Sequence, residues 1–396
     1  MRPVSPVAVL GAECICAAGP TLDTCMESML QGGHGPASPT LFACEQPEPF
    51  PVFEAADFTP GPGEDKYSRT VQLLLHTTRM AFAKAGITPD ALEGLRVGVC
   101  IGTSVGASLN FLDYYKRQKQ SGDLELAAIH TYVRSNPATA LARRYGFTGP
   151  AQAVVNACSS GTDAIGMGAA WVRQNLCDLV VAGGADELSE ISYNGFARLM
   201  ITSPEQCRPF DKNRKGLNLG EGAGVLLLAS ERTVAKLRGS VPAQVLGYGT
   251  CSDAHHLTAP HPEAFGLERA VNDALAQSGL GCGDIGFINV HGTGTANNDP
   301  VEGFLLKKLF KDTPFVATKG YTGHTLGAAG AMEAVLTVAG LEQGILPACH
   351  GFCETDPNIG LAPVARATKT SARFALSQSL AFGGNNSAIV LKRGDA

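Results

Sequence analysis

The chain has 396 residues, of which 44% are hydrophobic and 17% charged, and it carries a net charge of −5. This length allows two ordinary domains or one large α/β unit, and the hydrophobic share is ample for a buried core. The acidic balance, together with the lack of a long basic run, argues against a nucleic-acid-binding protein. The low charged share predicts that part of the surface is covered in an oligomer interface.

The cysteines and the apolar runs indicate the cellular compartment and argue against a metal site and a membrane span. The twelve cysteines are spread along the chain rather than grouped as in a disulfide scaffold, which predicts reduced thiols in a cytoplasmic protein. The pairs Cys14/Cys16 and Cys349/Cys353 lack partners at zinc-ligand spacing, so we expect no metal there. No segment approaches the roughly 18 apolar residues of a membrane span, so none is expected.

Short apolar runs bounded by glycine recur along the whole chain. They lie at residues 7–11, 97–102, 153–158, 179–185, 224–230, 243–249, 285–292, 314–320 and 388–392. Because these runs are nearly continuous and rich in β-branched residues, they predict strands buried on both faces. Helix-like stretches lie between them, at 70–85, 162–174, 265–278 and 330–342. The alternation of strands and helices predicts an α/β layered fold.

A weak internal repeat divides the chain. The segments "VGVCIGTSVG" (97–106) and "IGFINVHGTGT" (285–295) both run from an apolar strand into a turn of glycine and small polar residues, one in each half. We therefore expect two related halves, 1–240 and 241–396.

The segment "VVNACSSGTDA" (154–164) places Cys158 where an apolar strand gives way to a helix. Unpaired amides and the helix dipole at such an N-terminus stabilise a thiolate. Gly161, in the first turn, allows the close approach of a substrate or of another backbone. A small buried hydrophobe is nevertheless the usual role of a cysteine. This segment alone leaves a nucleophile and a core residue equally open.

Two of the nine histidines lie in glycine-rich turns. His291 follows a predicted strand and opens "HGTGT", and His324 lies in "KGYTGHTLGAAG" after a strand that is expected to end at Lys319. The carboxyl ends of strands are where α/β folds build their sites. A single histidine of this kind is more often structural, but two of them together with Cys158 favour one shared site. The histidine-containing segment 251–260 matches no common zinc pattern, so no metal site is expected.

Several separate motifs resemble those of the β-ketoacyl-acyl-carrier-protein synthases, most closely the elongating group. They are "NACSSG" around Cys158, "HGTGT" from His291, "TKGYTGHTLGAAGAME" with Lys319 and His324, and the tail "AFGGNNS". The resemblance covers essentially the whole chain. It implies an α/β thiolase fold, in which two pseudo-duplicated halves with mixed five-stranded sheets form αβαβα layers. The half 1–240 would then carry the nucleophilic cysteine, and the half 241–396 the two catalytic histidines.

The resemblance also implies the chemistry. Cys158 would take an acyl chain from an acyl carrier protein and hold it as a thioester, with the backbone amides of Cys158 and Phe382 as the oxyanion hole. A malonyl unit on a carrier would then lose carbon dioxide, and His291 and His324 would donate N–H groups to the enolate. Attack on the acyl-cysteine would give a β-ketoacyl product, in fatty-acid or polyketide/polyene elongation.

Further site residues follow from the same resemblance. Lys319 and Glu333 would form a supporting buried ion pair, with Lys319 orienting the histidine region. Thr293 and Thr295 would hydrogen-bond the phosphopantetheine arm of the carrier protein. No cofactor other than this carried arm is implied.

The C-terminal loop contains the expected gate. Phe382 would swing between the acylation and malonyl steps, and Gly383 and Gly384 would give the loop freedom to move. Val105 resembles a residue that lines the acyl pocket, and it is explained equally well as a core residue.

Five residues depart from the family pattern. Leu380 and Ala381 precede the gate where an aromatic residue or a glycine is more usual, and Asn385 stands where threonine is more usual. Lys215 and Asn218 replace an acidic and an apolar residue. We therefore expect an altered acyl pocket or gate, and with it a specialised substrate.

Three other classes of protein differ from this sequence at diagnostic positions. A thiolase-type acyltransferase uses a second cysteine near the C-terminus, but none follows Cys353. A chain-length factor, the catalytically weak partner of such synthases, normally lacks the nucleophile that is present here. A cysteine hydrolase needs an acidic or amide residue that orients its histidine, and the sequence nominates none.

The expected partners are an acyl carrier protein and either a second copy of the chain or a chain-length-factor-like subunit. Primary fatty-acid and secondary polyketide or polyene pathways both stay open, and the departures favour the second. Lys66 and Arg69, or Lys116, Arg117 and Lys119, are candidates for meeting an acidic carrier, although solvated surface charges are the commoner case.

Overall fold

The computed structural model describes residues 3–44, 48–104, 106, 112–122 and 126–394; Val105, the expected pocket residue, lies outside them. The first half contains β1 (Val7–Ile15), α1 (Leu22–Leu30), α2 (Arg69–Lys84), β2 (Val97–Gly102), α3 (Leu112–Ser121), α4 (Leu126–Arg134), α5 (Pro137–Tyr145), β3 (Ala151–Val154), α6 (Ser160–Arg173), β4 (Leu179–Asp186), α7 (Glu190–Arg198), β5 (Gly222–Ala229) and α8 (Glu231–Leu237). The second half contains β6 (Ala243–Ser252), α9 (Phe265–Ser278), β7 (Phe287–Asn289), α10 (Asn298–Leu309), β8 (Phe315–Val316), α11 (Lys319–Thr322), α12 (Ala329–Gln343), β9 (Ile345–Leu346), β10 (Thr368–Lys369), β11 (Phe374–Ala381) and β12 (Asn385–Arg393). Short 3₁₀ turns cover Pro89–Leu92, Cys282–Asp284, Leu326–Ala328 and Phe382–Gly384.

The main sheet has ten strands in the order β3-β2-β4-β5-β1-β6-β12-β11-β7-β8. Its first five strands come from the first half of the chain and its other five from the second half. The two groups have related topologies, because β2 lies parallel between β3 and β4 just as β7 lies parallel between β8 and β11. They are not separate sheets, since Val7–Val9 pairs with Ala243–Val245 and joins them edge to edge. The domain boundary expected at 240/241 falls between α8 and β6 and stays a prediction.

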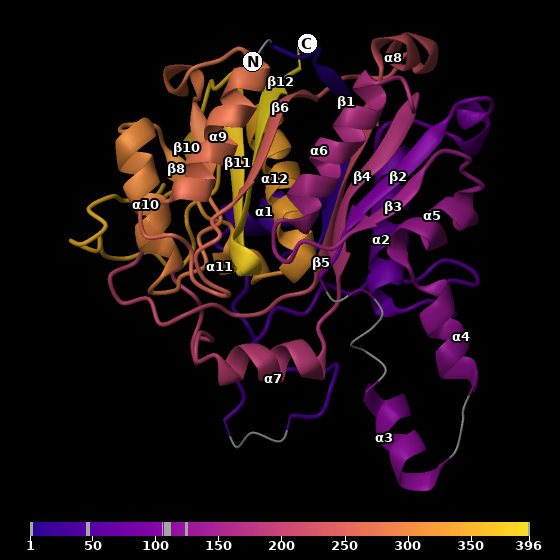
Figure 1. The fold of residues 1–396 in the computed structure, drawn as a ribbon, viewed down its shortest axis with the longest axis horizontal. Helices are drawn as coiled ribbons and strands as arrows, with labels where there is room; N and C mark the ends of the chain where they lie inside the picture. Colours follow the sequence, from indigo (N-terminus) through magenta and orange to yellow (C-terminus); the bar gives the residue numbers. More distant parts are fainter. Residues whose placement is uncertain (1–2, 45–47, 105, 107–111, 123–125, 395–396) are drawn as a thin grey trace.

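The helices and strands form five layers. Helices α6 and α12 lie between the two groups of strands, each contacting strands of both (Figure 1). Helices α2 and α5 cover the outer face of the first group, and residues of α9 and α10 form a core with the outer face of the second. The order is therefore α, β, α, β, α, which confirms the expected α/β fold class and its layers.

The central helices pack unusually closely because they are rich in small residues. Helix α12 is buried along the whole of Ala329–Leu341 and so has no face exposed to solvent over that stretch. A Cβ atom at Gly330 would lie 2.1 Å from Oγ1 of Thr162 in α6, so only glycine fits there. This approach brings the segments that precede α6 and α12 together at one end of the layers, and those segments contain Cys158 and His324.

Two expected strands end earlier than their apolar runs. The run 153–158 is a strand only as far as Val154, and Ala157 then adopts φ 50°, a left-handed conformation that no strand can continue. The run 314–320 forms β8 over Phe315–Val316 only. Lys319 therefore does not end a strand, as the sequence indicated, but begins the short helix α11 with its side chain buried.

Helices α3, α4 and α7 lie outside the layered body (Figure 1). An ion pair of 3.1 Å between Lys116 and Glu190 joins α3 to α7. Tyr193 anchors α7, because its ring is buried and its hydroxyl donates to the carbonyl oxygen of Phe50 over 3.2 Å. Among the helices described here, none has both the length and the apolar character to cross a membrane.

Candidate active site

Cys158 lies in the tight turn between β3 and α6, with 5% of its surface exposed. Ala157, just before it, has φ 50°, so the chain reverses sharply at this point. The amide of Ser160 donates to the carbonyl oxygen of Ala157 over 3.1 Å and closes the turn. The thiol is therefore presented at the N-terminus of a buried helix, where the sequence indicated it.

A buried carboxylate that sequence reasoning missed holds this turn in place. Asp163, in the first turn of α6, accepts hydrogen bonds from the Asn156 side chain at 2.6 Å and from the Ser159 hydroxyl at 2.9 Å. It also accepts from the Tyr248 hydroxyl at 2.8 Å and from the Ser387 hydroxyl. Because Tyr248 and Ser387 lie on β6 and β12, Asp163 fastens the nucleophile turn to the other half of the chain.

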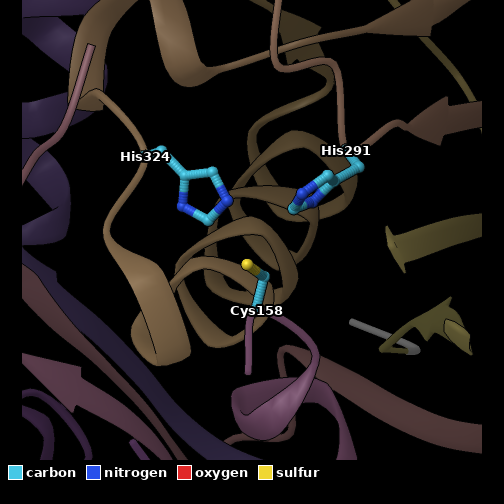
Figure 2. Close-up of side chains that lie close together, drawn as sticks. All are labelled: Cys158, His291 and His324. Atoms are coloured by element: carbon cyan, nitrogen blue, oxygen red, sulfur yellow. The ribbon is translucent and has the colours of Figure 1, made fainter. Parts of the chain in front are cut away.

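Two histidines from distant segments meet Cys158. His291 follows β7, and His324 lies between α11 and α12. The sulfur and one ring nitrogen of each histidine all lie within 4.8 Å of one another. The rings are nearly perpendicular, with centroids 5.1 Å apart, and both point toward the sulfur (Figure 2). The structure thus brings together the three residues that the motifs nominated.

The hydrogen bonds behind the rings determine which nitrogen carries the proton. The Nζ of Lys319 lies 3.1 Å from Nδ1 of His291. The backbone N–H of Leu326 donates to Nδ1 of His324 over 3.0 Å. An ammonium and an amide N–H can only donate, so both Nδ1 atoms must accept. Each neutral ring therefore presents Nε2–H as a donor on the side of Cys158.

Both rings are held neutral. Burial lowers the pKa of His291 and of His324 well below the usual value, and the positive charge of Lys319 lowers both further. At physiological pH the pair therefore offers two N–H donors without bringing a positive charge of its own.

Lys319 and Glu333 form the buried ion pair that the family resemblance implied. Lys319 also donates to the backbone oxygen of His291 over 2.5 Å. Burial raises the pKa of Glu333 to about 7, and the neighbouring Lys319 opposes that rise. This pair lies behind His291 and orients it, because Lys319 contacts both the ring and the backbone of that residue.

Burial has the opposite effect on the nucleophile from the one its helix position suggested. It raises the pKa of the Cys158 thiol to about 11, although Lys319 and the Phe382 amide both lower it. Desolvation of the thiolate thus outweighs the groups that favour it. The resting form is a thiol, and the expectation of a stable thiolate at the helix N-terminus is corrected.

Phe382 contacts the nucleophile through its backbone. Its N–H lies near enough to the Cys158 thiol to lower the pKa of that group. Gly383 and Gly384 follow with φ 84° and 77°, in the left-handed region that favours glycine. The Phe382 ring stacks on Phe196 of α7, with centroids 5.5 Å apart and an interplanar angle of 14°. Phe196 is a site residue that the sequence did not reveal.

A cavity of about 400 Å³ leads to the cysteine and both histidines. Thr293 and Thr295 line it, with their hydroxyl oxygens 2.9 Å apart. Phe382 and Phe196 form another part of the wall. The cavity therefore gathers the expected pantetheine threonines and the expected gate around the nucleophile.

A second buried carboxylate missed by sequence reasoning supports the His291 turn. Glu302 accepts from the backbone amides of His291 and Gly292, each over 2.7 Å. It also accepts from the side chains of Asn298 at 2.7 Å and Gln378 at 2.8 Å. Burial raises the pKa of Glu302 to about 7. Nothing in the sequence around Glu302 singled this acid out.

The residues that depart from the family pattern have different surroundings. Leu380 and Ala381 line the cavity, and Lys215 lines it with 57% of its side chain exposed. Asn218 does not line the cavity. It is 1% exposed, and its backbone carbonyl oxygen accepts a hydrogen bond from the backbone N–H of His324 over 2.8 Å. Its effect is therefore on the histidine segment rather than on an acyl pocket.

The cluster of Cys158, His291 and His324 has side chains of the kind that bind zinc. A zinc-bound histidine, however, normally donates its other N–H to an acceptor. Here both Nδ1 atoms face donors, so each Nε2 keeps its proton and has no lone pair for a metal. The geometry fits a pair of hydrogen-bond donors better than a metal centre.

Fold and site together define a cysteine-dependent condensing acyltransferase of the thiolase fold. Residues 4–233 match the N-terminal domain of β-ketoacyl synthases, and residues 242–352 match their C-terminal domain. The chain belongs to the β-ketoacyl synthase family.

The relatives of this chain include a 3-oxoacyl-[acyl-carrier-protein] synthase and a polyketide synthase subunit. The chain is 29% identical to 3-oxoacyl-[acyl-carrier-protein] synthase 2 of Coxiella burnetii, over 98% of either chain. It is 34% identical to the tetracenomycin polyketide synthase ketoacyl synthase alpha subunit of Streptomyces glaucescens, over 83% of this chain and 82% of that one. The solved ishigamide ketosynthase/chain length factor is similar over 100% of both chains, with 30% identity and a TM-score of 0.93.

Proposed function

We propose that this enzyme condenses an acyl group held on Cys158 with a malonyl unit carried by an acyl carrier protein, with loss of carbon dioxide. The observation that carries the proposal is the pair of neutral imidazoles, His291 and His324, whose Nδ1 atoms accept hydrogen bonds and whose remaining N–H groups face the cysteine. Such donors suit an anion that exists only during the reaction.

In the first step the Cys158 sulfur attacks the thioester carbonyl of an acyl carrier protein. The amides of Cys158 and Phe382 stabilise the oxyanion, and the effect of the Phe382 amide, which lowers the pKa of the Cys158 thiol, supports this role. The carbon–sulfur bond to the carrier breaks, a new one to Cys158 forms, and the carrier leaves as a thiol with the proton that Cys158 has lost. Because the resting group is a thiol, this proton must leave during attack.

In the second step the carbon–carbon bond between the malonyl α-carbon and its free carboxylate breaks, carbon dioxide leaves, and the electron pair of that bond forms the enolate of the thioester. Its oxygen accepts the two N–H groups of His291 and His324, and the positive charge of Lys319 behind His291 favours the negative charge. The enolate carbon attacks the acyl-cysteine carbonyl, so that a carbon–carbon bond forms and the bond to Cys158 breaks. The released thiolate is protonated again, and the β-ketoacyl product stays on the carrier.

The chemistry of this mechanism needs no resident cofactor. The substrates are carried on phosphopantetheine, and we assign Thr293 and Thr295, which line the cavity, to the amides of that arm. Phe382 is assigned as the gate, because two consecutive glycines follow it and its ring lies on the cavity wall.

For the assembly we propose a dimer, either of two copies or with a chain-length-factor-like subunit. Strand β3 is an edge of the sheet, and Val155 beside it is 69% exposed, which suits pairing with another chain. The likeness to a ketosynthase/chain length factor and to a polyketide ketosynthase favours the mixed pair and a secondary pathway.

A cytoplasmic location is proposed from the scattered cysteines.

The test is mass spectrometry of the enzyme after incubation with a panel of acyl carrier proteins that bear different acyl chains. An acyl group is expected on Cys158 and not on the Cys158→Ala variant, which should fold normally. The chain that is retained best identifies the substrate class. If Cys158→Ala still condensed acyl and malonyl carrier proteins, the assignment would be wrong.

A further inference from the structure

Asp186 is a buried acid that the mechanism above does not use. It is the last residue of β4, and Thr103 follows the end of β2, the parallel strand beside it. The Thr103 hydroxyl donates to Oδ1 of Asp186 over 2.5 Å, and the backbone N–H of Ser104 donates to Oδ2 over 2.7 Å. The Gly106 amide adds a longer bond to Oδ1, of 3.3 Å. Asp186 therefore holds the start of the loop that leaves β2.

The same carboxylate reaches the segment that carries His324. The backbone N–H of Gly327 donates to Oδ2 of Asp186 over 2.7 Å. Gly327 directly follows Leu326, whose own N–H donates to Nδ1 of His324 over 3.0 Å. Two consecutive amides thus have separate partners: the first fixes the histidine ring, and the second fixes the turn to Asp186.

The turn that contains these two amides is strained. Leu326 has φ 52°, a left-handed conformation that is uncommon for a bulky residue. Such a conformation persists only where the surrounding structure holds it in place. The hydrogen bond from Gly327 to Asp186 is a restraint of this kind. Without its acceptor, the backbone of Leu326 can relax and withdraw its N–H from the ring of His324.

Glycines allow the backbones to meet closely at this point. A Cβ atom on Gly327 would lie 2.4 Å from the backbone nitrogen of Ser104, so the histidine segment packs directly on the loop after β2. A Cβ atom on Gly102 would lie 2.2 Å from the backbone carbonyl carbon of Ser160, in the first turn of α6. Only glycine permits either contact. The position of the histidine segment relative to the nucleophile helix therefore depends on this junction.

Asp186 acts from outside the substrate cavity. Among the described residues, those that line the cavity include Cys158 and His324 but not Asp186 or Gly327. The carboxylate is nevertheless close to the sulfur. Burial is the main cause of the raised pKa of Cys158, and the negative charge of Asp186 adds a smaller part. Asp186 is thus near the site without touching a substrate.

We propose that Asp186 is a positioning residue for the malonyl step: it holds the Gly327 amide, and with it the strained turn from which His324 donates to the enolate oxygen. The role of the enolate rests on the proposed function, whereas the restraint on the turn concerns this chain alone. Asp163 fixes the nucleophile turn. Each of the two buried acids therefore supports a different step, Asp163 the acylation and Asp186 the decarboxylation.

The first test compares Asp186→Ala with the matched control Asp178→Ala. Asp178 is also buried, precedes the opposite end of β4, and accepts the backbone N–H of Arg96 over 2.9 Å. Both variants lose a buried acceptor, so both should melt at a lower temperature. Carbon dioxide release from malonyl carrier protein should fall about 10²-fold in Asp186→Ala, as expected for a misplaced reacting group, and less than about twofold in Asp178→Ala. Acylation of Cys158, read by mass spectrometry, should fall much less in either variant.

The kinetic constants and a conservative variant separate positioning from folding. Because Asp186 does not line the cavity, the loss in Asp186→Ala should appear in kcat for decarboxylation and not in the KM for the malonyl carrier. In Asp186→Asn the Thr103 hydroxyl can turn to accept from the new amide N–H, so the amide oxygen can still accept from Gly327. Asp186→Asn should therefore retain most of the decarboxylation that Asp186→Ala loses.

Gly327→Ala tests the same junction and leaves the carboxylate intact. Its methyl group would collide with the backbone of Ser104 and displace the turn. The control is Gly149→Ala, because a Cβ atom there would lie 2.5 Å from the carbonyl oxygen of Val97, at the opposite end of β2. Both variants should be less stable. Only Gly327→Ala should lower decarboxylation more than acylation.

Hydrogen exchange measures the position of the turn without any substrate. The Gly327 N–H loses its acceptor in Asp186→Ala, so amides of the peptide 324–328 should exchange faster than in the unmodified enzyme. Amides of the peptide 156–163, which Asp163 holds, should exchange at an unchanged rate. Asp178→Ala should change neither peptide.

Two results would overturn the proposal. Unchanged exchange of the peptide 324–328 in Asp186→Ala would show that the turn keeps its position without the carboxylate. Equal losses of acylation and decarboxylation in that variant would assign Asp186 to folding only. Failure of the proposed function would look different, because the unmodified enzyme would then release no carbon dioxide from malonyl carrier protein. The exchange experiment would still decide what holds the turn.

Discussion

The Nζ of Lys319 lies 3.1 Å from Nδ1 of His291, and this contact fixes the ring as a donor through Nε2. This buried ammonium thereby sets the tautomer and the orientation of the ring, and it adds to the lowering of the ring's pKa by burial. A positioning residue of this kind acts on the reaction through the histidine and not by touching the substrate.

Replacing Lys319 with methionine should therefore slow the malonyl step selectively. We expect decarboxylation of malonyl carrier protein to fall by about 10²-fold or more, because the His291 donor is no longer fixed. Acylation of Cys158, followed by mass spectrometry, should fall much less. The variant also leaves Glu333 buried without its partner and should melt at a lower temperature.

A double variant separates these two effects. Lys319→Met with Glu333→Gln removes both charges, so it should recover stability relative to the single variant without recovering decarboxylation. Lys307→Met, at an exposed lysine of α10, is the control for the loss of a positive charge. Recovery of carbon dioxide release in the double variant would show that the ion pair matters for folding alone.

His324→Ala should abolish the malonyl step as well. The variant loses one of the two donors to the enolate oxygen, which corresponds to a decrease of about 10²–10³-fold in carbon dioxide release. His324→Gln keeps an N–H group and should retain part of the rate. Exposed His130 on α4 provides the control, His130→Ala. Unchanged carbon dioxide release in His324→Ala would remove that histidine from the site.

The thiol of Cys158 should react as a protonated group across the physiological range. Its pKa is raised to about 11, so the thiolate fraction grows about tenfold for each pH unit below that value. Alkylation of Cys158 by iodoacetamide, read from its peptide by mass spectrometry, should accelerate accordingly between pH 7 and pH 9. A rate that levels off below pH 8 would show that Lys319 and the Phe382 amide outweigh burial.

The two histidines should show no titration over the same range. Their pKa values are lowered by burial and by Lys319, so each ring is already neutral at pH 7 and stays neutral as the pH rises. The histidines should therefore add no pH dependence to decarboxylation from pH 6.5 to pH 8, where Glu333, with its pKa raised to about 7, is expected to titrate. A rate that still rose through pH 6.5 in the double variant Lys319→Met with Glu333→Gln would mean that a histidine with an ordinary pKa takes part.

Asn218 offers a prediction about the segment that carries His324. Its side chain accepts from the Cys207 amide at 2.7 Å and donates to carbonyl oxygens of residues 51, 203 and 205. Asn218→Val leaves these buried groups unpaired, each at a cost of about 1–3 kcal/mol. We expect a lower melting temperature and a loss of decarboxylation that exceeds the loss of acylation.

The matched control for this residue is Asn213→Val, in the same loop but near the surface, where one side-chain bond reaches Glu354 over 3.5 Å. It should change neither stability nor the ratio of the two partial reactions. Equal losses of acylation and decarboxylation in Asn218→Val would indicate a role in folding only.

The sequence was sufficient for the layered class and for the residues that touch the reacting atoms. Buried strands are marked by continuous apolar runs, and Cys158, His291 and His324 lie in motifs whose types and order resemble one family. The residues at which the strands end were harder to predict from the sequence. The turn at Ala157 and the short β8 depend on local backbone conformation, which apolar runs do not encode.

The supporting residues were not predictable in the same way. Asp163 and Glu302 are ordinary acids in the sequence, and only the fold shows that each collects hydrogen bonds from several segments. Phe196 lies in a helix outside the layers and meets Phe382 through tertiary packing alone. The pKa of Cys158 likewise depends on burial, which its position at a helix N-terminus does not reveal.

The hydrogen bonds of Asp163 with Tyr248 and Ser387 also constrain which substitutions the sequence can accept. A substitution at any of the three leaves polar groups unmatched in the other half, so the two halves cannot diverge independently at this contact. For the same reason, exchanging one half with that of a related enzyme should disturb the nucleophile turn unless all three side chains are transferred together. The nucleophile turn thus depends on side chains from both halves of the chain.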